Sequence, residues 1–155
     1  MELKIRKAEM HDAEYLFNLA NDPVTRKNSF SSELIEWESH INWLEQKLNN
    51  EKSSIYIITN DGRNIGTVKF KNNDDEVVIG VTVDPNYRGL GLGALIIEKG
   101  CHEYWSTQDE NIIAYIKTTN KASKRIFEKA NFKLVEDVYY NSIRCHKLIA
   151  GNYEL

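Results

Sequence analysis

The segment with the clearest chemistry is Arg88-Gly89-Leu90-Gly91-Leu92-Gly93, which follows a strand-like run and precedes a helix-like run. A glycine-rich turn from a strand into a helix exposes unpaired backbone N–H groups at the positive end of the helix dipole. Because glycine has no side chain, phosphate oxygens can approach this backbone closely, and Arg88 can add a charge-assisted contact. The segment therefore predicts a site for a phosphate or pyrophosphate group.

Two other phosphate-binding loops compete with this interpretation. A P-loop requires Gly-Lys-Ser/Thr after the turn, whereas Gly93 is followed here by Ala94-Leu95, so that loop is excluded. The dinucleotide fingerprint GxGxxA fits Gly89 to Ala94 formally. It lies in mid-chain, however, and the next strand ends at Thr118-Thr119-Asn120 without an acid for a ribose, which argues against a nicotinamide cofactor.

At these residues the chain resembles the GNAT superfamily of acetyl-coenzyme A-dependent N-acetyltransferases. Arg88, Gly91 and Gly93 meet the family's (Q/R)xxGx(G/A) signature, and Asn120 to Phe132 resembles its NxxAxxxYxxxGF segment. The resemblance implies acetyl-coenzyme A as the cofactor, with its pyrophosphate on the loop and its pantetheine arm on the preceding strand. The cofactor-binding residues that it implies are Val81, Thr82, Val83, Arg88, Gly89, Leu90, Gly91, Leu92, Gly93, Asn120, Ser123 and Phe127.

The chain departs from the family where protons are transferred. Phe127 stands where many relatives have a tyrosine thought to protonate the thiolate, and Val78 stands where a glutamate often serves as base. Alternation along the strand places Glu76 on the same face as Val78, so Glu76 is a candidate base acting through water, against the alternative of a solvated carboxylate. Tyr140, beside Tyr139, is a candidate hydroxyl donor, against the alternative of packing in a closing strand.

The reaction expected is direct transfer within a ternary complex. Orientation of two reactants can supply an effective molarity of ~10⁵–10⁸ M, whereas positioned acid–base groups contribute ~10²–10⁴-fold. A missing acid or base is therefore compatible with turnover. Cys101 and Cys145 show no metal or redox spacing and are typical of small buried hydrophobes, so no cysteine acyl-enzyme and no metal site are expected.

The acceptor has to be sought in the first third of the chain. Ala20 to Phe30 and His40 to Trp43 resemble the subgroup that acetylates amino sugars carried on nucleotides, which implies acceptor contacts by Arg26, Ser29, His40 and Trp43. His40, Trp43 and Lys47 also share one helical stripe, where Trp43 could stack on a sugar or base. The alternative is that Trp43 belongs to the core and His40 is a satisfied polar residue.

Three functions follow from these residues. The first is N-acetylation of a primary amine, that of a nucleotide-linked amino sugar in particular. The second is acetylation of a ribosomal protein, a peptide or an aminoglycoside, since these enzymes share part of the pattern. The third is a non-catalytic acyl-coenzyme A sensor, which the absence of the usual tyrosine and glutamate suggests.

The elements that must position these residues follow the order βααβββαβαββ. Apolar alternation and helical spacing predict a mixed α/β fold, which the resemblance makes a mostly antiparallel seven-stranded sheet flanked by four helices. The strands expected are 3–6, 55–59, 65–70, 77–83, 112–117 and two around Asn141. The helices expected start after Asp12, near Glu36, at Ala94 and at Ala122, and the Asn21-Asp22-Pro23 turn is expected to end the first of them.

Length and composition bound the remaining possibilities. The 155 residues suit one domain, and 41% hydrophobic with 28% charged residues is ordinary for a globular protein. A net charge of −3 without a basic run gives no indication of nucleic-acid binding. Neither a signal peptide nor a membrane segment is indicated, so a cytoplasmic location is expected, with a homodimer left open.

Overall fold

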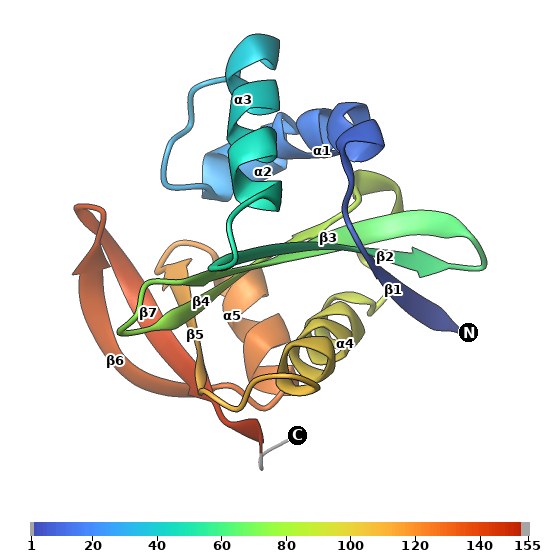
Figure 1. Cartoon of the computed structure of the whole chain (residues 1–155). Coiled ribbons are helices and arrows are strands. Elements are labelled where there is room, and N and C mark those ends of the chain that lie inside the picture. The colour runs from blue at the N-terminus through green and yellow to red at the C-terminus, as the bar shows by residue number, and fades with distance from the viewer. Residues whose placement is uncertain (1, 153–155) are drawn as a thin grey trace.

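The computed structural model describes residues 2–152, which form a seven-stranded sheet between two layers of helices (Figure 1). The strands are β1 (Leu3–Lys7), β2 (Ser53–Asn60), β3 (Arg63–Asn72), β4 (Val77–Val83), β5 (Ile112–Lys117), β6 (Lys133–Tyr140) and β7 (Ile143–Ala150). Their order across the sheet is β1-β2-β3-β4-β5-β7-β6, and β4 with β5 is the parallel pair. The predicted fold class, a mixed α/β fold with a mostly antiparallel seven-stranded sheet, is confirmed.

Residues 2–152 contain five α-helices, one more than expected. They are α1 (Ala13–Ala20), α2 (Pro23–Asn28), α3 (Trp37–Leu48), α4 (Gly93–Trp105) and α5 (Lys121–Lys129), with short 3-10 turns η1 (Met10–Asp12) and η2 (Pro85–Tyr87). The additional helix is α2, where Asp22 accepts a hydrogen bond from the Thr25 amide at 3.1 Å and Pro23 occupies the first turn. The turn predicted to end α1 therefore also begins α2, since an N-cap Asp followed by Pro is a helix-start signal.

Asp12 was predicted to cap the first helix with its side chain, and the structure shows a different role. Its carboxylate makes no capping bond to α1 and instead accepts two hydrogen bonds from Arg6, at 2.7 and 2.8 Å, and one from the Glu9 amide at 2.9 Å. This buried carboxylate thus fixes the passage from β1 into α1.

The two helical layers bury separate sets of apolar side chains. Below the sheet in Figure 1, α4 and α5 pack on β3, β4 and β5 around fully buried Ile96, Ile112 and Leu148. Above it, α1 and α3 cover β2 through Leu16, Leu44 and Ile57. None of the helices within residues 2–152 is both long and apolar enough to cross a membrane.

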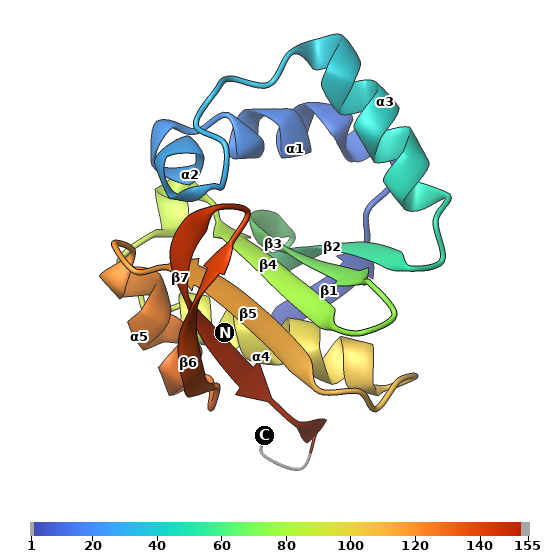
Figure 2. The same cartoon turned by 90° about the vertical axis from the view of Figure 1, so that its left-hand side faces the viewer.

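The upper layer is tied to the end of β4 by polar side chains. The Tyr15 hydroxyl on α1 donates to Asp84 at 3.0 Å, and Arg88 forms an ion pair with Asp22 at 2.9 Å. Asp84 and Asp22 also accept backbone N–H groups that start η2 and α2. These contacts hold α2 over the connection that contains the glycines, as Figure 2 shows from the side of the β6–β7 hairpin.

Candidate functional site

The central feature of the site is a separation of β4 from β5. The two strands pair at Val77 with Ile112 and at Val78 with Ile113, and the pairing in the structure ends there. Beyond Val78, the edge of β4 that faces β5 has no strand partner among the described residues. Its backbone N–H and C=O groups are therefore open to a ligand, as the sequence resemblance implied for Val81 to Val83.

A cavity of about 900 Å³ passes through this separation and reaches both faces of the sheet. On the α4–α5 side it is bounded by Arg88 to Gly93, which we call the glycine loop, and by residues of both helices, including Phe127 and the α5 N-cap Asn120. On the α1–α3 side it is bounded by α2, α3, β3 and the β6–β7 hairpin, including Trp43, Lys69 and Tyr140. The cavity thus has two compartments joined between β4 and β5.

The glycine loop combines two different uses of glycine. Gly89 and Gly91 have φ angles of 75° and 76°, and a Cβ at either position would meet nothing within 4 Å. Gly93 differs, because a Cβ there would lie 2.8 Å from Ile126 of α5. Only the first two glycines leave space beside the cavity, whereas Gly93 allows α4 and α5 to pack closely.

Arg88 lines the cavity, but several of its N–H groups already form hydrogen bonds within the protein. Its guanidinium bonds the Val83 carbonyl and the Thr25 hydroxyl, each at 3.1 Å, besides its ion pair with Asp22. The contact of Arg88 with phosphate stays a prediction. The backbone of the α4 N-terminus is the more direct anion site here, because Leu92 at the N-cap offers no side-chain acceptor.

The other predicted cofactor residues converge on the cavity with one exception. Asn120 caps α5 by accepting the Ser123 amide at 3.2 Å, and Phe127 is buried edge-on against Phe132. Leu90 is the exception: its side chain is 64% exposed and lies outside the lining. The predicted residues that line the cavity are Val81, Thr82, Val83, Arg88, Gly89, Gly91, Leu92, Gly93, Asn120, Ser123 and Phe127.

The predicted acceptor residues divide into two pairs. Ser29 and Trp43 line the cavity, whereas Arg26 and His40 do not. The Arg26 guanidinium bonds the carbonyls of Ala20, Ser31 and Glu33 and the Ser29 hydroxyl, so it organises the α2–α3 connection.

His40 is a core residue, contrary to its predicted place in the acceptor site. It is 3% exposed, contacts the Ala13 carbonyl through Nε2 at 3.0 Å and stacks behind Trp43 with 5.8 Å between ring centroids. Burial lowers the pKa of His40. His40, the first residue of the predicted helical stripe, therefore faces the core and supports the Trp43 ring from behind.

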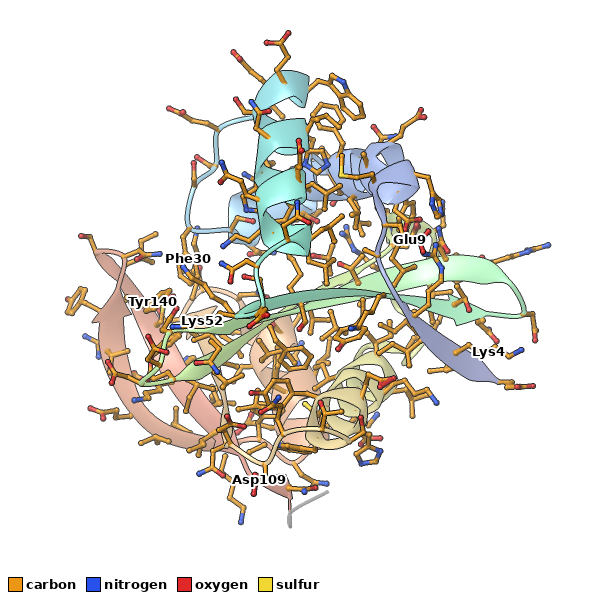
Figure 3. All side chains as sticks on the ribbon, viewed as in Figure 1. Lys4, Glu9, Phe30, Lys52, Asp109 and Tyr140 are labelled. Atoms are coloured by element: carbon orange, nitrogen blue, oxygen red, sulfur yellow. The ribbon has the colours of Figure 1, made fainter. Side chains whose placement is uncertain are left out.

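The two candidate catalytic residues also lie differently. Tyr140 lines the cavity, where it stacks on Tyr115 at 4.0 Å and contacts Phe30 edge-on at 5.1 Å. Figure 3 shows Phe30 and Tyr140 close together between the upper helices and the hairpin. Burial raises the pKa of Tyr140, so its hydroxyl keeps its proton at neutral pH.

Glu76 lies outside the cavity lining. It accepts a hydrogen bond from Tyr115 at 2.5 Å and pairs with Lys147 at 3.0 Å. Burial opposes its ionisation, but Tyr115 and Lys147 outweigh burial and lower the pKa of Glu76. A carboxylate with these partners is a weak base, and its hydrogen bond fixes the position of Tyr115. A catalytic role for Glu76 stays a prediction.

Sequence reasoning missed several cavity residues, among them Thr25, Phe30, Lys69 and Tyr115. Lys69 and Tyr115 could have been found in the sequence, because each is a polar side chain within a mostly buried stretch of a central strand. Within the described chain no carboxylate lines the cavity. Nor do residues 2–152 contain a group of His, Cys, Asp and Glu side chains suited to a metal ion.

The acetyltransferase (GNAT) domain family matches residues 2–133. The chain belongs to this family. The expectation of an acyltransferase that uses acetyl-coenzyme A is thereby confirmed at the level of the family. A curated relative, mycothiol acetyltransferase from Thermomonospora curvata, is 30% identical over 95 residues, which are 59% of this chain and 32% of the relative. The chain therefore spans about a third of that relative's length.

Solved structures of the same fold include acetyltransferases with different acceptors. Aminoglycoside acetyltransferase AAC(6')-Ib with coenzyme A is 16% identical, with a TM-score of 0.86 over 99% of this chain and 96% of that one. The spermidine N-acetyltransferase of Vibrio cholerae with coenzyme A and spermine is 12% identical, with a TM-score of 0.86 over 98% and 96%. At these identities the similarity establishes the fold and leaves the acceptor open.

Proposed function

We propose that this protein transfers the acetyl group of acetyl-coenzyme A to the primary amine of a nucleotide-linked amino sugar. The observation that carries the proposal is the charge of the cavity. Its lining within residues 2–152 includes Lys47, Lys69, Lys71, Lys117 and Lys129 and contains no Asp or Glu. Such a lining suits an acceptor that carries negative charge in addition to its amine.

The same charge argues against polycationic acceptors. Kanamycin and spermine, present in two of the structures with this fold, carry several ammonium groups. A cavity lined by lysines would repel these groups, and no carboxylate of the described lining could pair with them. Peptides stay the nearer alternative, since a peptide can carry acidic side chains.

The lysines also favour the reactive form of the amine. A positive charge nearby lowers the pKa of an amine, because it destabilises the ammonium form. The acceptor would then bind as the neutral amine and attack the thioester directly, with orientation supplying ~10⁵–10⁸ M of effective concentration. Tyr140 is the candidate donor of a proton to the departing thiolate, whose reference pKa is about 8.5.

Neither cysteine supports an acyl-enzyme. Cys101 and Cys145 are each fully buried and lie outside the cavity lining. Burial raises the pKa of both thiols, which keeps them protonated and poorly nucleophilic. Direct transfer in a ternary complex is the mechanism consistent with their positions.

A thiol-release screen with acetyl-coenzyme A tests the proposal. The panel contains uridine-diphosphate-linked amino sugars, the matching free amino sugars, acidic and neutral peptides, kanamycin and spermine. We expect release above background with a nucleotide-linked amino sugar and none with kanamycin or spermine. Release only with peptides or polycations would refute the acceptor assignment, and binding of acetyl-coenzyme A without release with any amine would identify a sensor.

A further inference from the structure

Lys69 occupies an unusual place in the acceptor compartment, by which we mean the part of the cavity on the α1–α3 side of the sheet. It lies on β3 between Ile55 of β2 and Gly80 of β4, its partners in the sheet. Ile55 is buried, whereas a Cβ at Gly80 would meet nothing within 4 Å, so open space adjoins Lys69 on the β4 side. That space lies next to the point where β4 and β5 separate, and hence beside the route to the cofactor.

An aromatic wall and a second lysine accompany Lys69. Its Nζ lies 5.1 Å from the centre of the Trp43 ring, which His40 supports from behind. Lys47 follows Trp43 by one helical turn, lines the same cavity and projects from the same face of α3. The three side chains form one side of the acceptor compartment.

These two lysines lack a counter-ion in the described part of the chain. None of the ion pairs within residues 2–152 includes Lys47 or Lys69. Burial, together with the charges of Arg26 and Lys47, lowers the pKa of Lys69. Placing like charges at a partly enclosed site is unfavourable for the protein alone, and a bound anion would offset it.

We propose that Lys69 and Lys47 bind the diphosphate of the acceptor, with Trp43 as the aromatic wall beside it. The assignment rests on the proposed function for the location of the acceptor, and it adds the residues that select a phosphorylated one. Two ammonium groups on one wall suit the paired charges of a diphosphate. Gly80 leaves the space through which the amine reaches the thioester.

Calorimetric titration with inorganic pyrophosphate and with uridine 5′-diphosphate tests this assignment. The protein is first saturated with coenzyme A, so that the glycine loop is occupied and cannot bind the probe. We expect Lys69→Met and Lys47→Met each to weaken both probes by about ten-fold or more, the usual loss for one charge-assisted contact. Lys69→Arg keeps the positive charge and should bind both probes nearly as tightly as wild type, which tests the assignment even if Lys69→Met does not fold.

Lys52→Met is the matched control. Lys52 is exposed, pairs with Asp74 and lies outside the cavity lining, so its loss should leave both affinities unchanged. Equal binding of the probes by wild type and Lys69→Met would overturn the assignment. A fall in thiol release that is the same for acceptors with and without phosphate would overturn it as well.

Failure of this assignment can be told apart from failure of the proposed function. If nucleotide-linked amino sugars release thiol but Lys69→Met leaves their KM unchanged, the function stands and the diphosphate site does not. If the probes bind through Lys69 but no nucleotide-linked amino sugar releases thiol, the anion site stands and the proposed acceptor does not.

Discussion

Gly91 shows most directly how one residue serves the cofactor. Its φ of 76° is unfavourable for any residue with a side chain, and open space surrounds its Cα. A methyl group there would both strain the loop and enter the space where we place the pyrophosphate. These two effects can be separated, because Gly62 in the β2–β3 turn has a similar φ of 81° and also adjoins open space.

We predict that Gly91→Ala and Gly62→Ala each lower the free energy of unfolding by roughly 1–2 kcal/mol, the usual loss for a left-handed residue that gains a Cβ. Only Gly91→Ala should raise the KM for acetyl-coenzyme A, by about ten-fold for a weakened anion contact. Urea unfolding and initial rates measure the two effects. An unchanged cofactor KM in Gly91→Ala would remove the loop from the binding site.

Tyr140 is the residue that we expect to protonate the thiolate. Tyr140→Phe keeps the stack on Tyr115 and the contact with Phe30 but removes the hydroxyl. We predict that kcat falls by about 10²-fold, the lower end for a general acid, with the KM for acetyl-coenzyme A unchanged. Tyr139→Phe is the control, because Tyr139 is 74% exposed and lies outside the cavity lining.

At the scale of elements, the site depends on how closely α4 and α5 pack. A Cβ at Gly93 would meet Ile126 of α5, and α5 also carries Ser123 and Phe127, which line the cavity. We predict that Gly93→Ala lowers stability by roughly 1–3 kcal/mol, as overpacking does, and raises the cofactor KM by shifting α5.

A double-mutant cycle with Ile126→Ala tests the packing explanation. The second substitution removes the atoms that a Cβ at Gly93 would meet, the nearest at 2.8 Å. The double variant should therefore be less destabilised than the sum of the two single variants. Strict additivity would show that the loss arises elsewhere, for example in the backbone of the loop.

The join between β1 and α1 is also an element-scale feature, and it depends on pH. The hydrogen bonds from Arg6 outweigh burial and lower the pKa of Asp12. A carboxyl whose pKa is lower in the folded state stabilises the protein above its unfolded pKa of about 3.9, and this contribution disappears as the pH falls through the folded pKa.

Asp12→Asn should therefore destabilise the protein by roughly 1–3 kcal/mol at pH 7, the usual value for hydrogen bonds to a charged group. The difference from wild type should shrink below about pH 4, because Asp12 of the unfolded chain then takes up a proton, whereas the folded carboxyl does so only at lower pH. Urea unfolding at pH 7 and pH 3 measures it. Asp74→Asn, which breaks the exposed pair with Lys52, should change stability by less than about 1 kcal/mol at either pH.

At the scale of the whole molecule, segments distant in sequence enclose the acceptor compartment. Phe30 from the α2–α3 connection contacts Tyr140 at the hairpin between β6 and β7. Lys117 at the end of β5 donates to the Lys27 carbonyl of α2 at 3.1 Å, a second link between the first and last thirds of the chain. The compartment is thus closed by contacts between the first and last thirds of the chain.

We predict that Phe30→Ala raises the KM for the acceptor by about ten-fold, the upper end for one aromatic contact, and leaves the KM for acetyl-coenzyme A unchanged. Leu34→Ala in the same connection is the control, since Leu34 is 75% exposed and lies outside the cavity lining. Initial rates with each substrate varied in turn give both constants. A rise in the cofactor KM alone would place the acceptor elsewhere.

Local patterns in the sequence were sufficient for the sheet, four of the helices and the glycine loop. Strand alternation, helical spacing and glycine-rich turns depend on neighbouring residues, so Arg88 to Gly93 could be interpreted as an anion site before the fold was known. Asn120 to Phe127 were assigned to the cofactor only through the resemblance to the GNAT family. The sequence also contained the start signal of α2, Asp22-Pro23, which was interpreted only as a stop for α1.

The tertiary structure decided which polar side chains face the cavity. Helical spacing grouped His40 with Trp43, but packing of α3 on α1 turned His40 inward and left Trp43 at the wall. Arg26 bonds carbonyls of the α2–α3 connection, and Glu76 bonds Tyr115 and Lys147. Lys69 entered the site because Gly80 beside it has no side chain. The positions of His40 and Glu76 depend on partners distant in the chain, about which local spacing carries no information.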